Sequence, residues 1–97
     1  MNNSAYGIPY ASDKELGITP LLVERGKTHG DWKTQSAIAF AFHQIIEEHA
    51  NRLYASQREA LDMIATKMSR ILAGNANFAD HWDDIIGYAK LGKDAYE

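Results

Sequence analysis

The sequence predicts an all-α protein: a small antiparallel helical bundle with three main helices and a short leading helix. Apolar residues recur at the 3.6-residue period of a helix in three long segments, and no window alternates at the two-residue period of a strand. Helix start and stop signals separate these segments. The chain has 97 residues, a length that fits one domain.

The first 17 residues are rich in Asn, Ser, Gly and Tyr and have no apolar period. We therefore expect a flexible N-terminal arm over 1–17 and a single helical domain over 18–97. A second interpretation stays open, in which Tyr6, Ile8 and Tyr10 dock the arm onto the body or onto another subunit.

The short leading helix is predicted to begin at Thr19 and Pro20, because a capping hydroxyl followed by proline is typical of a helix start. We expect Gly26 to end it, with 27–31 as a connecting turn. Asp31 is then predicted to cap a long helix that runs to about Asn51.

This second helix carries one wide apolar stripe, made of Ile38, Phe42, Ile45, Ile46 and Leu53. Phe40 lies almost opposite the stripe. An apolar ring on the outer side of a helix suggests a second contact surface, for example between subunits.

The third helix has the capping-box pattern of Ser56 followed by Glu59, and Gly74 is a natural end for it. The fourth is expected to begin near Asn77 or Asp80 and to run toward Tyr96. The predicted core face of the third helix is Leu61, Ile64, Ala65, Met68, Ile71 and Leu72. The fourth helix is expected to pack Trp82, Ile85, Ile86 and Ala89 inward.

The composition excludes several function classes. The formal net charge is −3, which argues against general electrostatic binding of nucleic acid. The chain has no cysteine, so it has no disulfide framework or thiolate metal site, as suits a cytoplasmic protein. No apolar run approaches the ~20 residues of a membrane span, so no membrane partner is expected.

Acidic residues gather in the second half of the chain. Glu59 and Asp62 lie three apart on the third helix, and Asp80, Asp83 and Asp84 lie at the start of the fourth. Carboxylate oxygens are the ligands of Mg²⁺, which bridges to substrate phosphates. Acids in a first helical turn also complement the helix dipole, so a purely structural role stays open. Antiparallel packing would place Asp80 nearer to Arg70 than to Glu59, unless another subunit contributes.

Lys67 and Arg70 lie three apart, and such a pair suits phosphate oxygens. The alternative is structural, with Lys67 solvated and Arg70 paired to Asp80 or Asp84. His29, Gly30 and Asp31 either place a base or ligand over a pocket or form a turn with an Asp cap.

The run from Glu59 to Arg70, followed by Asp80-His81-Trp82-Asp83-Asp84-Ile85-Ile86-Gly87-Tyr88-Ala89, carries a resemblance. It resembles small, mostly phage-encoded domains related to the MazG-like all-α nucleotide pyrophosphohydrolases. Their pattern is an early (His or Tyr)-Gly-Asp, then Lys-x-x-Arg, then Asp-x-Trp-x-Asp-Ile-x-Gly-Tyr-Ala. The resemblance covers about residues 21–92.

The resemblance implies a dimer or tetramer that uses Mg²⁺, with Mn²⁺ as a substitute, to hydrolyse nucleoside triphosphates to monophosphate and pyrophosphate. The family holds its metal with Glu-x-x-Glu and Glu-x-x-Asp. This chain departs from that pattern through its shorter Asp side chains and through His81, which stands where a Glu is expected. The metal ligands it implies are Glu59, Asp62, Asp80 and Asp84, with Asp83 as a substitute.

The sequence therefore predicts a phage-type, MazG-like domain in the host cytoplasm that binds nucleotide phosphates through a divalent metal, with hydrolysis left open. Glu59, Asp62 and Asp84 are the candidate catalytic residues. The candidate substrate-binding residues are Lys67, Arg70, His29, Asp31 and Tyr88. The alternative is a non-catalytic helical interaction protein that modulates a host or phage partner, in which Lys67–Asp84 and Arg70–Asp80 are structural ion pairs.

Overall fold

The computed structural model describes residues 18–95 and confirms the all-α prediction. Within these residues the structure has four α-helices, α2 (Ile18–His29), α3 (Trp32–His49), α4 (Ala55–Ala73) and α5 (Ala79–Lys93), and a short 3₁₀ helix, η2 (Ala50–Arg52), follows α3. Residues 18–95 contain no strand, and their helices lack the combination of length and hydrophobicity that a membrane span requires. The predicted arm lies outside the described residues, and so does Tyr96.

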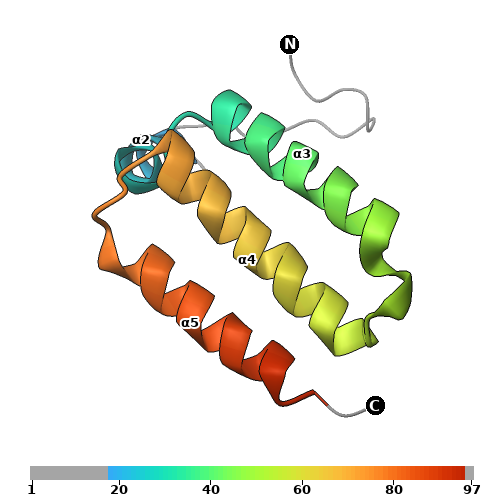
Figure 1. The fold of residues 1–97 in the computed structure, drawn as a ribbon. Coiled ribbons are helices and arrows are strands. Elements are labelled where there is room, and N and C mark those ends of the chain that lie inside the picture. Colours follow the sequence, from blue (N-terminus) through green and yellow to red (C-terminus); the bar gives the residue numbers. More distant parts are fainter. Residues whose placement is uncertain (1–17, 96–97) are drawn as a thin grey trace.

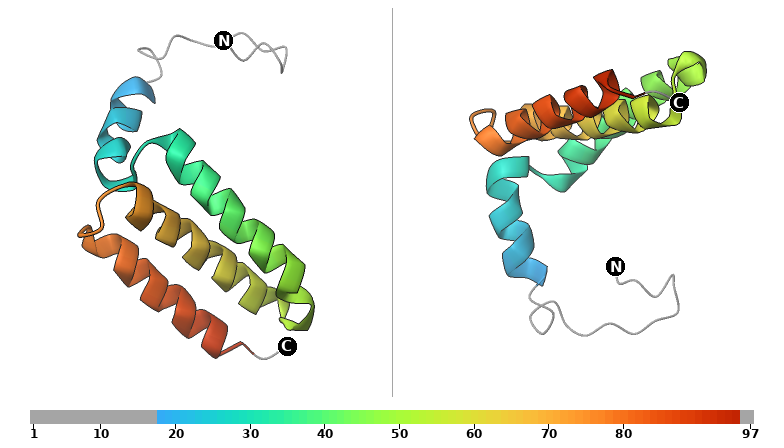
Figure 2. Two further views of the ribbon diagram at one scale, coloured as in Figure 1. Left: turned by 45° about the horizontal axis from the view of Figure 1, so that its top comes forward. Right: turned by 90° about the horizontal axis from the view of Figure 1, so that it is seen from below.

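The three long helices form one layer. α4 lies between α3 and α5 and runs antiparallel to both (Figure 1). Seen along its edge, the layer is flat, and α2 projects from one of its two faces (Figure 2). The two faces of α4 that do not meet α3 or α5 are therefore open, except where α2 crosses the end of the layer.

The first connection differs from its prediction. α2 continues through Gly26 as far as His29, and only Gly30 and Asp31 separate it from α3. Gly30 has a φ of 83°, in the left-handed region that favours glycine, and its N–H donates to the Gly26 carbonyl at 3.1 Å. Asp31 caps α3 as predicted, since its Oδ2 accepts from the Thr34 N–H at 3.0 Å.

The start of α4 also differs. The helix begins at Ala55, one residue before the predicted cap, and Tyr54 occupies the cap position. The Gln57 side chain reaches back and accepts from the Tyr54 N–H at 3.1 Å, so Gln57 does what was predicted for Glu59. The end at Gly74 agrees with the prediction.

Two tight turns meet at the end of the layer where α2 attaches. A Cβ placed on Gly30 would lie 2.2 Å from the Ala73 carbonyl oxygen, and one on Gly74 would lie 2.4 Å from the Thr28 carbonyl oxygen. The Asn75 N–H donates to the same Thr28 carbonyl at 3.0 Å. This contact fixes the end of α2 against the α4–α5 turn.

Most of the predicted core side chains are not buried. Ala60 and Ala65 are the only apolar residues that are buried among those the structure describes. Leu61, Met68 and Leu72 of α4 are exposed, as are Trp82, Ile86 and Ala89 of α5, against the prediction. Phe40 is exposed as expected. The physical reason is the layer itself, because a helix in a single layer has neighbours on its edges and none on its faces.

Candidate functional site

A cleft opens where α2, the first turn of α3 and the last turns of α4 come together. Its volume is about 700 Å³, within the range of small-molecule sites. Its lining combines polar and charged groups with apolar side chains of α2 and α3. The lining residues are Thr19, Leu22, Val23, Arg25, Gly26, His29, Gly30, Asp31, Trp32, Gln35 and Arg70.

Three basic side chains meet in this cleft. Burial, followed by the positive charge of Arg25, lowers the pKa of the Arg70 guanidinium, and the carboxylate of Asp84 only partly opposes this. The pKa of His29 is also lowered, first by burial and then by the charges of Arg70, His81, Arg25 and Lys67. Basic groups that lower one another's pKa in this way create a region of positive potential, which a bound anion would neutralise.

The Arg70 side chain is half-buried, and its Nε has no hydrogen-bond partner. A buried guanidinium N–H without an acceptor is costly, so it points to a missing acceptor. Arg70 was predicted to bind substrate, and its place on the cleft wall fits that prediction.

The buried imidazole of His81 packs against the ring of His29. His81 is 2% exposed, and its Nε2 donates to the Thr28 carbonyl at 2.9 Å. The ring of His81 packs edge-on against those of His29 and Phe78, at centroid distances of 5.0 and 4.9 Å. His81 therefore acts as a structural anchor between α5 and the end of α2, although the resemblance places a metal-binding Glu there.

Lys67, also predicted to bind substrate, is not among the lining residues of the cleft. Its Nζ lies 2.9 Å from Asp84 Oδ2, so it joins α4 to α5. The ammonium side chain is 12% exposed and the carboxylate side chain 46%. The Lys67 ammonium lowers the pKa of Asp84, through its hydrogen bond first and its charge second. This pair matches the structural alternative that the sequence left open.

The five acidic candidates are divided between two places. A Cβ placed on Gly92 would lie 3.2 Å from the Ala60 Cβ, and Lys67 pairs with Asp84, so the start of α4 lies beside the end of α5. Asp62 precedes Lys67 by five residues, which is about 7 Å along the helix. In residues 18–95, no group of three or more His, Asp or Glu side chains is placed to hold a metal ion. One chain therefore does not bring Glu59 and Asp62 together with Asp80, Asp83 and Asp84.

Asp62 instead belongs to a network between α3 and α4. Its Oδ1 lies 3.1 Å from His43 Nδ1, and its Oδ2 lies 3.4 Å from Arg58 Nε. His43 Nε2 lies 3.3 Å from the Thr66 hydroxyl, and Arg58 also pairs with Glu47 at 2.6 Å. The carboxylate that the sequence assigned to metal thus has two partners, His43 on α3 and Arg58 on α4, and Arg58 in turn reaches Glu47 on α3.

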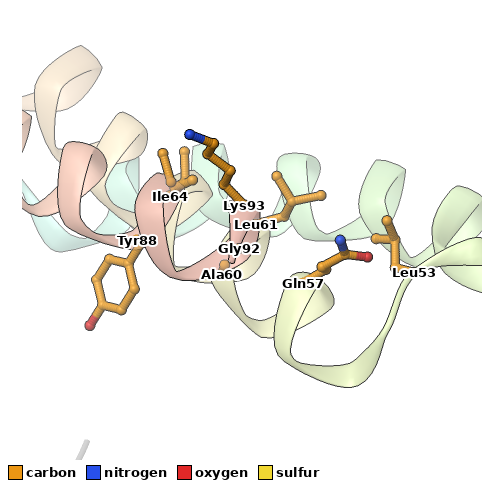
Figure 3. Close-up of a pocket in the computed structure, with 9 residues that line it drawn as sticks. Leu53, Gln57, Ala60, Leu61, Ile64, Tyr88, Gly92 and Lys93 are labelled. Atoms are coloured by element: carbon orange, nitrogen blue, oxygen red, sulfur yellow. The ribbon is translucent and has the colours of Figure 1, made fainter. Parts of the chain in front are cut away.

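Tyr88 lies apart from the other substrate-binding candidates. It lines a second, mostly apolar groove of about 320 Å³ between α4 and α5. Figure 3 shows this groove with Leu61 and Ile64 of α4 facing it and Lys93 at the end of α5. Because His29, Asp31 and Arg70 line the other cleft, Tyr88 is not part of the same site.

Among the polar side chains of the cleft, sequence reasoning missed Arg25 and Gln35. Arg25 was not singled out because the leading helix was expected to end at Gly26, which would have separated it from His29. Gln35 is 4% exposed, and its Nε2 donates to Ser69 Oγ at 3.4 Å. A polar residue on the buried side of a predicted apolar helix was the one signal that marked it.

Comparison with known proteins gives one family. The model for a domain of unknown function, DUF6378, matches residues 19–96. Neither a curated protein nor a solved structure matches the chain.

Proposed function

The chain belongs to the DUF6378 family, and from the geometry of its cleft we propose that it binds a nucleotide or a related phosphate ligand between α2, α3 and α4. The observation that carries this proposal is the half-buried Arg70 guanidinium, whose Nε lacks an acceptor and whose nearest charged neighbours include a second arginine, Arg25. A phosphate would accept from Arg70 and neutralise both charges.

The rest of the cleft supports a ligand with an apolar or aromatic part. Leu22, Val23 and Trp32 line the same cleft as the arginines and are all more than 50% exposed. An indole ring and two aliphatic side chains suit the flat face of a nucleobase. Phosphate binding at Arg70 with the base on Trp32 would use both the charged and the apolar lining residues.

We further propose that the chain hydrolyses a nucleoside triphosphate with Mg²⁺ or Mn²⁺. The support for it is the resemblance to the MazG-like enzymes, on the motifs around Lys67, Arg70 and Asp84. The carboxylates of one chain do not fit a shared metal, because Asp62 and Asp84 each pair with a basic side chain and lie on separate parts of the layer. Phosphate binding by the basic residues is therefore proposed independently of the metal.

Binding is tested by calorimetry on the full chain with inorganic pyrophosphate and with a panel of canonical and modified nucleoside triphosphates, with and without Mg²⁺ or Mn²⁺. Arg70→Gln should weaken binding roughly tenfold or more, since it removes a charged donor. Arg52→Gln, at the exposed end of η2, is the control and should bind as the parent does. Equal affinity of Arg70→Gln and the parent would refute the proposal.

Hydrolysis is tested separately by product analysis with the same nucleotides and metals. Turnover to monophosphate and pyrophosphate that is lost in Glu59→Gln would support an active MazG-like enzyme. Binding without turnover would leave a phosphate-binding domain and refute the enzymatic part alone.

The second candidate is a non-catalytic interaction protein, favoured by the ion pair between Lys67 and Asp84. The double variant Asp80→Asn, Asp84→Asn discriminates the two. A large loss of stability in the absence of metal would favour a structural role for these acids. Intact folding with nucleotide binding that is lost only in the presence of metal would favour a metal-ligand role for these acids, whereas binding that is retained or strengthened would favour the phosphate site at Arg70.

A further inference from the structure

The imidazole of His29 uses one of its two ring nitrogens within the fold. Its Nδ1 lies 2.6 Å from the Thr28 hydroxyl oxygen, which in turn lies 3.2 Å from the Arg25 carbonyl oxygen. A carbonyl oxygen can only accept and a hydroxyl has one proton, so the Thr28 hydroxyl donates to Arg25 and accepts from His29. Nδ1 therefore carries the proton of the neutral ring, and Nε2 carries the lone pair.

The packing around His29 keeps its ring in this orientation. The ring of His81 lies edge-on against it, at a centroid distance of 5.0 Å and an interplanar angle of 77°. His81 is itself fixed, because it is 2% exposed and donates from Nε2 to the Thr28 carbonyl. Turning the His29 ring over would break its bond to the Thr28 hydroxyl. The fold thus selects which nitrogen of His29 is protonated.

The second nitrogen of this ring, Nε2, makes no hydrogen bond to any residue in 18–95. His29 lines the cleft between α2, α3 and α4, and Arg25 and Arg70 line the same cleft. Burial, followed by the charge of Arg70, lowers the pKa of His29, so the ring is neutral at neutral pH. A neutral imidazole with an unused lone pair is a nucleophile.

We propose that His29 Nε2 accepts a phosphoryl group from the ligand of this cleft and forms a phosphohistidine. The inference rests on the proposed phosphate site and adds a covalent step to it. A guanidinium is a forked donor that binds phosphate oxygens, and two of them, Arg25 and Arg70, share the cleft with the lone pair. A nucleophile beside groups that stabilise the charge of the transferred phosphoryl group is the arrangement that phosphoryl transfer requires.

The step balances without a co-reactant. The Nε2 lone pair forms a bond to the terminal phosphorus of the ligand, and the bond from that phosphorus to the leaving oxygen breaks. The electron pair of the broken bond departs with the oxygen, so the leaving group is released as an anion. The ring becomes a phosphorylated imidazolium whose Nδ1–H still donates to the Thr28 hydroxyl, and no proton has to move.

The acidic group of the cleft indicates which class of donor it can use. Asp31 is the one carboxylic acid among the described lining residues. Its Oδ2 accepts from the N–H of Thr34 at 3.0 Å and from the hydroxyl of Thr34 at 3.1 Å, so it serves as an ionised helix cap and not as a proton donor. The leaving oxygen of a phosphate ester needs a proton, whereas a nucleoside diphosphate or a carboxylate leaves as a stable anion. The donor is therefore a phosphoric anhydride, such as a nucleoside triphosphate or an acyl phosphate.

The test is incubation of the full chain with a nucleoside triphosphate labelled at its terminal phosphorus, with acetyl phosphate, or with a nucleoside monophosphate. Mass spectrometry at alkaline pH, where phosphohistidine is stable, should show one added phosphoryl group with the two anhydrides and none with the monophosphate. Peptide mapping of the parent should place the group on His29, and phosphorus NMR should place it on Nε2.

Four variants test the assignment of the residues. His29→Asn should lose the phosphoryl group, and Arg70→Gln should take it up roughly tenfold or more slowly, because a charged donor is removed. Thr28→Val keeps the shape of the side chain and removes the hydroxyl that fixes the tautomer, so it should slow the uptake without abolishing it. His49→Asn, at the exposed end of α3, is the matched control and should be phosphorylated as the parent is.

Nitrogen NMR of the parent gives a result that depends on no variant. The His29 ring should be neutral at neutral pH, with its proton on Nδ1. A proton on Nε2 would overturn the proposal, and so would a phosphoryl group on any other residue. A parent that binds pyrophosphate through Arg70 but takes up no phosphoryl group would overturn the covalent step alone. A parent that does not bind pyrophosphate would refute the phosphate site and this step together.

Discussion

Lys67 Nζ and Asp84 Oδ2 lie 2.9 Å apart and join the middle of α4 to the first turns of α5. The sequence assigned one of these groups to phosphate and the other to metal, yet in the chain they neutralise each other. Arg70, three residues after Lys67, keeps a guanidinium Nε without an acceptor. The basic residue that is available to a ligand is therefore Arg70.

Removing the Asp84 charge should strengthen anion binding. Asp84→Asn deletes the carboxylate whose charge partly offsets Arg70 and also releases Lys67. The affinity for pyrophosphate should rise by about two- to fivefold at low salt and less at high salt, as expected for a screened charge at several ångströms. Calorimetry measures it, and Asp83→Asn, outside the ion pair, should have a smaller effect. Weaker binding by Asp84→Asn would instead indicate that this carboxylate contributes to ligand or metal binding.

Gly30 should be the glycine that the fold tolerates changing least. Gly30→Ala places a Cβ 2.2 Å from the Ala73 carbonyl oxygen at a φ of +83°, and strain of this kind costs roughly 3 kcal/mol or more of unfolding free energy. Gly26→Ala is the matched control, since no atom lies within 4 Å of its Cβ and it lies inside α2. That variant should gain about 0.5–1 kcal/mol. Urea unfolding measures the unfolding free energy of both variants. A loss of well under about 3 kcal/mol in Gly30→Ala would contradict the close contact of Gly30 with the end of α4.

His29 should make stability and binding respond to pH in opposite directions. Its folded pKa lies below the ordinary value of 6.5, so the unfolded chain binds more protons. The contribution to stability is complete above pH 6.5 and falls as the pH is lowered from 6.5 through the folded pKa. A bound anion raises that pKa, so the affinity contributed by His29 rises over the same window.

Imidazole NMR titrations with and without pyrophosphate measure both effects. His29→Asn should remove the pH dependence that this group gives to binding. An unchanged His29 pKa in the presence of a saturating anion would show that the ligand does not approach the cleft.

His81 should contribute to stability and not to metal binding. His81→Leu removes a buried donor to the Thr28 carbonyl and should cost about 1–2 kcal/mol. Chemical unfolding with and without Mg²⁺ measures this cost. Mg²⁺ should have the same effect on the unfolding free energy of His81→Leu as on that of the parent. A metal-dependent stabilisation that His81→Leu abolishes would contradict the structural assignment.

The helices could be predicted because their signals are local. The cap at Asp31 and the end at Gly74 depend on residues next to them in sequence, and both agree with the structure. The inward direction of Leu61, Met68 and Trp82 could not be predicted, since an apolar stripe indicates that something covers it and not which chain does. In a single layer these side chains face outward.

The candidate site was likewise predictable only where it depends on local sequence. His29, Asp31 and Arg70 line one cleft, as the motifs suggested. The separation of Asp62 from Asp84 depends on which ends of α4 and α5 lie side by side, and spacing within each helix carries no information on that. Arg25 entered the cleft because α2 extends past Gly26, where tertiary contacts at Thr28 and Gly30 override the low helix propensity of glycine.

The most direct test of the proposed phosphate site is a two-dimensional NMR titration of the full chain with a nucleoside triphosphate, observing backbone amides and arginine Nε–H groups. The proposal predicts saturable shifts at Arg25, His29 and Gln35 and a large downfield shift of the Arg70 Nε–H as it gains an acceptor. Saturable shifts confined to the groove around Leu61 and Tyr88, or no shifts at millimolar ligand, would contradict it.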